Sequence, residues 1–328
     1  MAKVIVTGGT GFIGSHVVEH LIQQGFDVHC LVRPSRKKLG WLEGLRVQVI
    51  HVDVTNADAL KPVLQDSEFI FHIAGTTKVR RKEEYYIGNV LTTKALLEGL
   101  RGNSRLKKFC HISSLSVVGP SPDGVPLNED SPYRPISLYG KAKCEAEQLV
   151  NSFSGSIPTV ILRPPTVYGP RDTDVFEMFQ WTGRGIMPLI GKEEKTLSMI
   201  HAKDLARGIA EATLSEKSTG KTYFISNEPI YPFSMIVKLL TEIQHKRKAL
   251  MVRFPDFAMV TLAALAQFGA KFASRPNILN LDKVNEILKP HWICSPKKIK
   301  DELGFQSQIS LEDGLQSTYE WYKQEGWL

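Results

Sequence analysis

Two residues one helical turn apart, Tyr139 and Lys143, are the part of this sequence best suited to chemistry. Side chains four positions apart lie on the same face of a helix, so the ammonium group would stand beside the phenol. A nearby positive charge favours the ionised phenol, and we therefore expect the pKa of Tyr139 to fall from about 10 toward neutrality. Such a phenol can give or take a proton at a carbonyl or alcohol oxygen. Because this spacing is also common on solvated helices, it indicates a catalytic pair only if other features point to the same site.

A glycine-rich turn near the N-terminus points to a ligand site. The apolar stretch Val4–Thr7 predicts a short strand, and the chain then continues as Gly8, Gly9, Thr10, Gly11, Phe12, Ile13 and Gly14. Glycine permits a tight turn and lets the backbone approach a pyrophosphate, whose charge is favoured at the positive end of the helix that follows. A glycine triplet placed between a strand and a helix therefore predicts a dinucleotide-binding turn.

Strand and helix patterns alternate through the first half of the chain. We expect strands at Lys3–Thr7, Asp27–Val32, Val47–Val52, Glu68–Ile73, Lys108–Ser113 and Pro158–Arg163. We expect helices at Phe12–Gln24, Ala57–Leu64, Tyr86–Gly99 and Leu138–Phe153. This alternation predicts an α/β fold, a Rossmann-type doubly wound parallel sheet with helices on both faces. Ligands of such sheets bind beyond the carboxyl ends of the strands, which is where the candidate residues fall.

The second half of the chain has a different character. Residues 164–171 are rich in turn formers, and short helices, strands and prolines follow. We expect a dinucleotide-binding domain at 1–170 with return segments near 196–250, and a smaller mixed α/β substrate lobe at 171–328. The most apolar stretch of this half, Phe257–Ala266, predicts a core or lid helix; a helix lying on a lipid surface is the lesser alternative.

Composition narrows the class of protein. The chain has 328 residues, with 42% hydrophobic and 23% charged residues, as in ordinary globular proteins. Its 41 basic and 34 acidic residues leave a diffuse charge of +7 without a basic arm or helix, so we expect no nucleic-acid partner. No run approaches the roughly 20 apolar residues of a membrane span, and no membrane partner is expected. The chain begins Met-Ala-Lys directly before the first strand, and no cysteine pair suggests a disulfide or a metal; we expect reduced thiols, no bound metal and a cytoplasmic location.

Several motifs together resemble the extended short-chain dehydrogenase/reductase family, and the resemblance runs nearly end to end. Besides Tyr139 and Lys143, the motifs are Thr7–Gly14, Asp53-Val54, Phe71–Gly75, Asn89–Thr93, Ile112–Gly119, Leu162-Arg-Pro164, Val167–Pro170 and His201–Asp204. The order in which they occur is specific for the family and less specific for any one reaction.

The resemblance implies roles for individual residues. Tyr139 would be the general acid/base, and Lys143 would lower its pKa and hold the ribose hydroxyls of a nicotinamide cofactor. Ser114 would hydrogen-bond the reacting oxygen, because its spacing from Gly119 fits this role better than that of the neighbouring serines. Asn89 looks like the helix residue that steadies the site. The implied cofactor contacts are Gly8, Gly11, Phe12, Ile13, Gly14, Asp53, Val54, Ala74, Asn89, Tyr139, Lys143, Pro164 and Val167, and the implied substrate contacts are Ser114, Thr76, Lys78 and Thr166.

The end of the second expected strand bears on the choice of cofactor. NAD-binding enzymes commonly place an acidic residue there for the ribose 2′-hydroxyl, whereas this chain has Val32 followed by Arg33. A guanidinium offers a planar fork to a 2′-phosphate, and Arg36 could add a second contact. We therefore expect NADP to be preferred over NAD, and we interpret the lysines that follow Arg36 as a solvated loop.

Two groups of substrates compete. Nucleotide-sugar epimerases and dehydratases of this family use an asparagine and an arginine to grip a diphosphate, and Thr166 and Leu197 stand at those positions here, although Lys192 or Lys195 could substitute. The segments Leu31–Pro34 and Trp292–Lys298 look more like dihydroflavonol-reductase-like and hydroxysteroid-dehydrogenase-like members, which act on alcohols and ketones of apolar molecules. We therefore favour a ketone or alcohol oxidoreductase over an epimerase or dehydratase with a recycled cofactor.

Two further expectations concern partners and activity. The chain could bind a dinucleotide without turnover, but proteins of that kind often lose the tyrosine or the lysine, and both are present here together with Ser114. Family members often dimerise through helices that include the Tyr-Lys helix, so a homodimer is expected by analogy.

Overall fold

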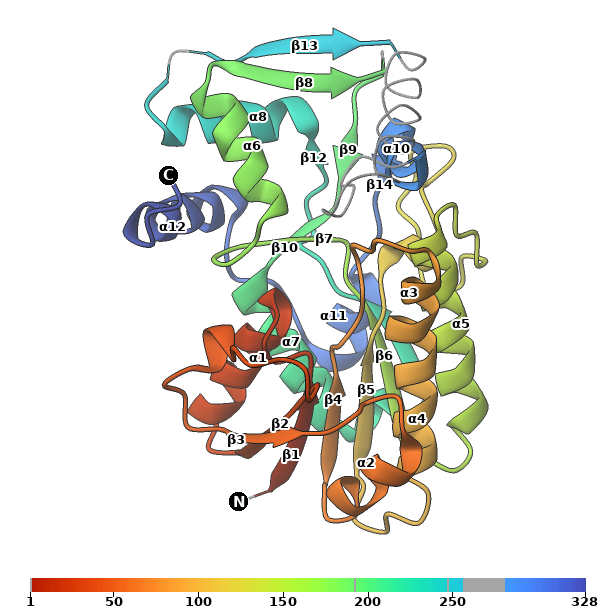
Figure 1. Ribbon diagram of the computed structural model, residues 1–328. Coiled ribbons are helices and arrows are strands. Elements are labelled where there is room, and N and C mark those ends of the chain that lie inside the picture. The colour runs from red at the N-terminus through yellow and green to blue at the C-terminus, as the bar shows by residue number, and fades with distance from the viewer. Residues whose placement is uncertain (1, 192, 247, 256–280) are drawn as a thin grey trace.

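A seven-stranded parallel sheet forms the lower half of the molecule (Figure 1). Its order is β11-β6-β5-β4-β1-β2-β3, and all neighbouring strands run parallel. The strands are β1 (Lys3–Thr7), β2 (Asp27–Val32), β3 (Gln48–His51), β4 (Phe69–His72), β5 (Lys108–Ile112), β6 (Thr159–Arg163) and β11 (Lys221–Phe224). The six strands expected in the first half are thus present to within one residue at each end, and the Rossmann-type α/β class is confirmed.

The coordinates come from a computed structural model, which describes residues 2–191, 193–246, 248–255 and 281–328. The expected helix at Phe257–Ala266 and Lys192 lie outside these residues. Within them, no helix is long and apolar enough to cross a bilayer.

Helices cover both faces of the sheet, each over its own core (Figure 1). One face packs against α1 (Phe12–Gln23), α7 (Ala202–Leu214) and α11 (Lys297–Leu303). The other packs against α2 (Ala57–Leu64), α4 (Thr92–Gly99) and α5 (Leu138–Phe153). Central strands such as β4 are buried throughout, which is why they read as continuous apolar runs rather than alternating ones.

The helix expected at Tyr86–Gly99 begins earlier and is interrupted. It consists of α3 (Glu83–Tyr86), a π-helical segment (Ile87–Leu91) and α4. Glu83 and Glu84 supply no apolar periodicity, but acidic residues are favoured in a first helical turn. The π-helical segment contains Asn89, and such segments are frequent at functional sites.

The start of α5 is pressed against the turn that follows β5. The Ser137 hydroxyl caps the helix by accepting a hydrogen bond from Gly140 N at 3.0 Å. A Cβ at position 140 would lie 2.6 Å from the Ser116 carbonyl oxygen, so only glycine allows this approach. The close contact brings the first turn of α5, which carries Tyr139, next to the segment that begins at Ser114.

The lobe expected to bind substrate, which we call the substrate lobe, lies above the sheet in Figure 1. Its strands are β7 (Thr166–Tyr168), β8 (Ile186–Ile190), β9 (Thr196–Leu197), β10 (Met199–His201), β12 (Tyr231–Pro232), β13 (Leu250–Phe254) and β14 (His291–Trp292). Its helices are α6 (Asp174–Gly183), α8 (Phe233–Ile243), α10 (Leu281–Leu288) and α12 (Leu311–Gln324). The expectation of an irregular loop at 164–171 is wrong in part, because this segment contains β7, which pairs with β10.

Candidate active site

The glycine-rich turn has the geometry expected of a pyrophosphate cradle. Gly8 has a φ of +77°, and a Cβ there would lie 2.6 Å from Ala74 N. A Cβ at Gly14 would lie 2.1 Å from the Gly8 carbonyl oxygen, so α1 can pack on the turn only with glycine at that position. Gly11 precedes α1 in an extended conformation and provides no side-chain cap for Phe12 and Ile13. The first N–H groups of this 12-residue helix therefore have no side-chain cap, and Gly11, which precedes them, is exposed. The glycine-rich turn and the start of α1 thus fit a dinucleotide pyrophosphate.

The residues expected to select the cofactor follow β2 and β3. Arg33 and Arg36 are exposed, and Arg36 Nε donates to the Lys38 carbonyl oxygen at 3.1 Å. A Cβ at Gly40 would lie 3.8 Å from both Arg36 Nη2 and the Thr10 carbonyl oxygen, which places this loop beside the glycine-rich turn.

Asp53 and Val54 lie just beyond the end of β3. Asp53 Oδ1 accepts hydrogen bonds from Thr55 N at 2.9 Å and Thr55 Oγ1 at 2.7 Å, and these bonds lower the pKa of Asp53. Val54 is buried in the core beneath α2. Of the two expected adenine contacts, Asp53 thus offers a carboxylate held by Thr55, and Val54 offers backbone anchored by its buried side chain.

Asn89 holds the loop that follows β4. Its Nδ2 donates to the carbonyl oxygens of Thr76 at 3.1 Å and Tyr85 at 2.8 Å, and its Oδ1 accepts from Thr76 N at 3.2 Å. A Cβ on Gly75 would come within 2.9 Å of Asn89 Oδ1 and 3.9 Å of Lys143 Nζ. Asn89 thus steadies Ala74–Thr76 directly beside the lysine.

The structure brings Ser114 and Tyr139 together. Ser114 follows β5, and its hydroxyl accepts from Ser116 N at 3.1 Å. The same hydroxyl forms a hydrogen bond with Tyr139 that lowers the pKa of the phenol. The Tyr139 ring also lies beside that of Tyr85, with centroids 6.2 Å apart.

The expected fall in the pKa of Tyr139 is wrong for this structure. Burial, which excludes water from a phenolate, raises its pKa to about 12 despite the bond to Ser114, and the charge of Glu286 adds to the rise. Lys143 is itself 2% exposed and donates to the Ile112 carbonyl oxygen at 2.5 Å. Burial lowers the pKa of Lys143 to about 8. The i, i+4 spacing indicated that the two residues lie on one face of the helix, but it did not indicate how far each is removed from water: Lys143 is buried and Tyr139 is half-buried.

Three of the other expected contacts lie at the junction with the substrate lobe. The Pro164 carbonyl oxygen accepts from Leu115 N at 3.0 Å, and Thr166 and Val167 belong to β7. Lys78 was expected to face substrate, but its Nζ contacts Asp174 Oδ1 at 2.6 Å. Lys78 therefore joins the loop after β4 to the start of α6 through an exposed ion pair.

Several residues at this site were not predicted from the sequence. His72 and Thr93 lie behind the loop at Ala74. They belong to the motifs Phe71–Gly75 and Asn89–Thr93, but neither was assigned a role from the sequence. From the far end of the chain, Asn285 Nδ2 donates to the Ile136 carbonyl oxygen at 2.9 Å and so docks α10 against the start of α5. Glu286 is the next residue of α10, and its negative charge raises the pKa of Tyr139. Nothing in the local sequence around Glu286 indicates that it reaches a residue so distant in the chain.

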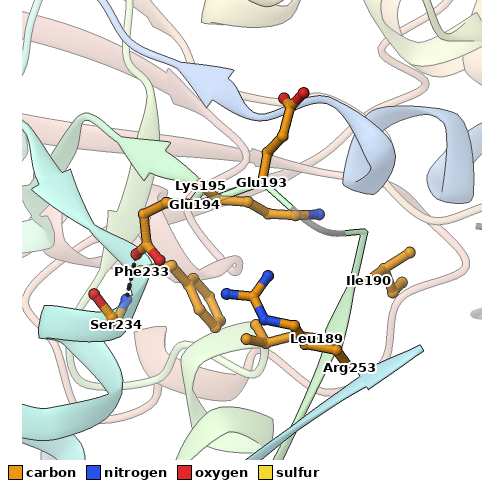
Figure 2. Close-up of a pocket in the computed structure, with 8 residues that line it drawn as sticks. All are labelled: Leu189, Ile190, Glu193, Glu194, Lys195, Phe233, Ser234 and Arg253. Atoms are coloured by element: carbon orange, nitrogen blue, oxygen red, sulfur yellow. Dashed lines mark hydrogen bonds between the residues drawn. The ribbon is translucent and has the colours of Figure 1, made fainter. Parts of the chain in front are cut away.

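A small pocket in the substrate lobe bears on the diphosphate alternative. Figure 2 shows it between β8, β13 and the start of α8. Its cavity is about 10 Å³, which leaves room for roughly one water molecule. Arg253 and Lys195 line it together with Glu193 and Glu194, and Glu194 accepts from Ser234 N at 3.0 Å. Both bases contact backbone carbonyl oxygens: Lys195 Nζ donates to that of Ile287, and Arg253 Nη1 donates to that of Gly191 at 3.3 Å. The described residues contain no cluster of three or more potential metal ligands.

Comparisons with known proteins place the chain in a family. The model of the NAD dependent epimerase/dehydratase family matches residues 4–226, and the chain belongs to that family. The protein is accordingly an NAD(P)-dependent enzyme of the extended short-chain dehydrogenase/reductase type, and its chemistry moves a hydride between a nicotinamide cofactor and a carbon that bears oxygen.

Individual relatives span both reaction types. A protein of Caulobacter vibrioides named ceramide reductase is 28% identical over 326 residues, which cover 99% of this chain and 96% of that protein. A ketoreductase of Stigmatella aurantiaca that acts on a farnesylated dihydroquinoline oxide is 27% identical, covering 95% of this chain and 94% of its own. Among solved structures, UDP-glucuronic acid 4-epimerase from Bacillus cereus with UDP-glucuronic acid and NAD has a TM-score of 0.79 and 27% identity, covering 98% of this chain and 99% of that one.

Proposed function

We propose that this enzyme interconverts a ketone and an alcohol on an apolar small molecule, with Tyr139 as the general acid/base. The observation that carries the proposal is the close contact of Gly140 with Ser116, which sets the Tyr139 phenol beside the Ser114 hydroxyl at the carboxyl edge of the sheet, one helical turn from the buried Lys143. Around these residues, the glycine-rich turn, the loop held by Asn89 and the end of β5 supply the remaining contacts.

The protonation states favour carbonyl reduction at neutral pH. A nicotinamide cofactor held by the glycine-rich turn and Lys143 would supply the hydride. With a pKa of about 12, the Tyr139 phenol carries its proton at pH 7 and can donate it to the oxygen on which charge develops. The Ser114 hydroxyl would donate a second hydrogen bond to the same oxygen. Lys143, with a pKa of about 8, remains mostly charged at pH 7 and suits ribose hydroxyls.

The charges of the substrate lobe support an apolar substrate. Lys78 is paired with Asp174, and the bases of the Figure 2 pocket, Lys195 and Arg253, donate to backbone carbonyl oxygens. The relatives named ceramide reductase and farnesylated-quinoline ketoreductase act on apolar molecules that carry a ketone or alcohol. The alternative, an epimerase or dehydratase acting on a nucleotide sugar, is favoured by the solved epimerase structures.

We further propose a preference for NADP, a cytoplasmic location and a homodimer. Arg33 and Arg36 are exposed in the loop after β2, and the part of that loop at Arg36 and Gly40 lies beside the glycine-rich turn, so the two arginines suit a 2′-phosphate. Tyr86, Ile87 and Leu138, on α3, the π-helical segment and α5, are 45%, 44% and 40% exposed and supply apolar surface for a second copy. In this division of labour, residues 1–170 bind the dinucleotide, with return segments at 196–250, and 171–328 mainly bind the substrate.

The purified protein can be tested against pooled ketosteroids, long-chain keto-amides, flavonoids and nucleotide sugars, with NADPH and NADH in parallel. We expect net loss of NADPH fluorescence with at least one apolar ketone and a slower loss of NADH. Conversion of a nucleotide sugar without net loss of either cofactor would identify an epimerase and overturn the proposal. Cofactor binding without turnover of any compound in the panel would instead support a non-catalytic dinucleotide-binding protein.

A further inference from the structure

Two threonine hydroxyls flank the ring of His72 at the end of β4. His72 Nδ1 lies 2.8 Å from Thr7 Oγ1, and Nε2 lies 2.9 Å from Thr93 Oγ1. His72, Thr7 and Thr93 are all buried, with exposed fractions of 0%, 1% and 0%. The three residues connect the end of β1, the end of β4 and the first turn of α4.

The second bonds of the two threonines fix the proton on the ring. Thr93 Oγ1 donates its only hydrogen to the Asn89 carbonyl oxygen at 2.6 Å, so it must accept from His72 Nε2. His72 therefore carries its proton on Nε2, and Nδ1 accepts from the Thr7 hydroxyl. Thr7 Oγ1 in turn accepts from Ala74 N at 3.2 Å. Every donor in this chain of hydrogen bonds has an acceptor only if His72 is neutral and carries its proton on Nε2.

The chain closes on the loop that borders the cofactor. It begins at the backbone of Ala74 and ends at the backbone of Asn89, whose side chain clamps Thr76 through both its amide nitrogen and its oxygen. Ala74 is also the residue against which Gly8 packs. The glycine-rich turn and the loop after β4 are thus tied into one ring of contacts through His72.

We propose that His72 is a positioning residue: its Nε2-protonated ring, held between Thr7 and Thr93, fixes Ala74–Thr76 in the conformation that receives the cofactor. This inference rests on the proposed use of a dinucleotide and goes beyond it, because it assigns a role to three residues whose side chains are buried beneath the loop. A fixed loop binds more tightly because it loses less conformational freedom on binding.

The arrangement is insensitive to pH in the working range. Burial, reinforced by the charge of Lys143, lowers the pKa of His72 to about 3, so the ring stays neutral. Two rings on β5 face it: Phe109, which does not titrate, at a centroid distance of 5.8 Å, and His111 at 5.3 Å. Burial and the charge of Lys143 likewise lower the pKa of His111 well below its ordinary value. Both rings therefore stay neutral, and the chain of hydrogen bonds from Ala74 N to the Asn89 carbonyl oxygen keeps its direction.

The test uses the Thr93 hydroxyl, which can be removed without changing side-chain volume. In Thr93→Val the chain ends at His72, and we expect the dissociation constant for NADPH to rise about two- to tenfold, as the loss of one buried hydrogen bond implies. Thr93→Ser keeps the hydroxyl and should restore near-normal binding. Thr318→Val is the matched control, because Thr318 is equally buried and donates in the same way to the Gly314 carbonyl oxygen at 2.6 Å, far from the loop.

A second readout is independent of the cofactor. Nitrogen-15 NMR of histidine-labelled protein, with the His72 signals assigned by their loss in His72→Asn, should show the proton on Nε2 throughout pH 6–8. A proton on Nδ1, or NADPH binding that is unchanged in Thr93→Val, would overturn the inference. If the wild-type protein binds no dinucleotide, the proposed function fails, whereas the NMR result still decides the direction of the hydrogen-bond chain.

Discussion

Tyr139 and Lys143 respond to burial in opposite directions, and together they remain a proton donor beside a cation. The pKa of the phenol rises to about 12 and that of the ammonium falls to about 8, since burial disfavours the charged form of each. Glu147, one further turn along α5, raises the pKa of Lys143 and moderates the effect. At the residue scale, the site keeps the Tyr139 phenol protonated, so a bound substrate would face a proton donor.

The shifted lysine makes a prediction about stability and pH. Between its folded pKa of about 8 and its unfolded pKa of about 10.4, Lys143 binds more protons in the unfolded chain, so the free energy of unfolding should rise with pH in this window. From pH 7.5 to 9.5 we expect the wild-type protein to gain about 1–2 kcal/mol relative to Lys143→Met. Chemical denaturation of both proteins at these pH values measures the difference.

The matched control for this experiment is Lys141→Met. Lys141 is an exposed lysine on the same helix, and its removal should leave the pH dependence of the wild-type protein unchanged. Parallel stability curves for the wild-type protein and Lys143→Met would show that Lys143 is not desolvated as described.

At the scale of elements, the sequence predicts what short-range physics decides. The boundaries of α2 and α5 were predicted correctly, and each helix is capped by a polar side chain: Asn56 Oδ1 accepts from Asp58 N and Ala59 N, and Ser137 accepts from Gly140 N. The π-helical segment at Ile87–Leu91 could not be predicted, since pattern reasoning assumes a regular helical period. The docking of α10 on Ile136 was equally out of reach, because it joins segments far apart in the chain.

The loop after β2 supports a prediction about the cofactor. Replacing Arg33 by Asp puts a negative charge where a 2′-phosphate would bind, and we expect NADPH affinity relative to NADH to fall at least about tenfold through lost charge-assisted hydrogen bonds. Fluorescence titration with both cofactors measures the ratio. Lys37→Asp makes the same charge change at an exposed position of the same loop and should alter the ratio much less. An unchanged ratio in Arg33→Asp would remove the basis for an NADP preference.

At the scale of the whole molecule, the site is assembled from both lobes. Lys78 reaches Asp174, Arg171 from the loop after β7 donates to Ser15 on α1 at 2.9 Å, and α10 brings Glu286 toward Tyr139. The sequence predicted the sheet and the placement of candidate residues at its carboxyl edge, because both follow from local pattern and parallel topology. It could not predict the partner of Lys78 or the influence of Glu286, since these depend on how the lobes pack.

Turnover by Tyr139→Phe tests the central claim most directly. The variant loses only the phenolic oxygen, so we expect the thermal unfolding midpoint and the NADPH dissociation constant to stay near the wild-type values. Turnover of the substrate found in the panel should fall by about 100-fold or more. Tyr85→Phe, which removes the phenol of the neighbouring ring, should keep most of the activity. Wild-type turnover in Tyr139→Phe would contradict the assignment of Tyr139 as the residue that exchanges the proton.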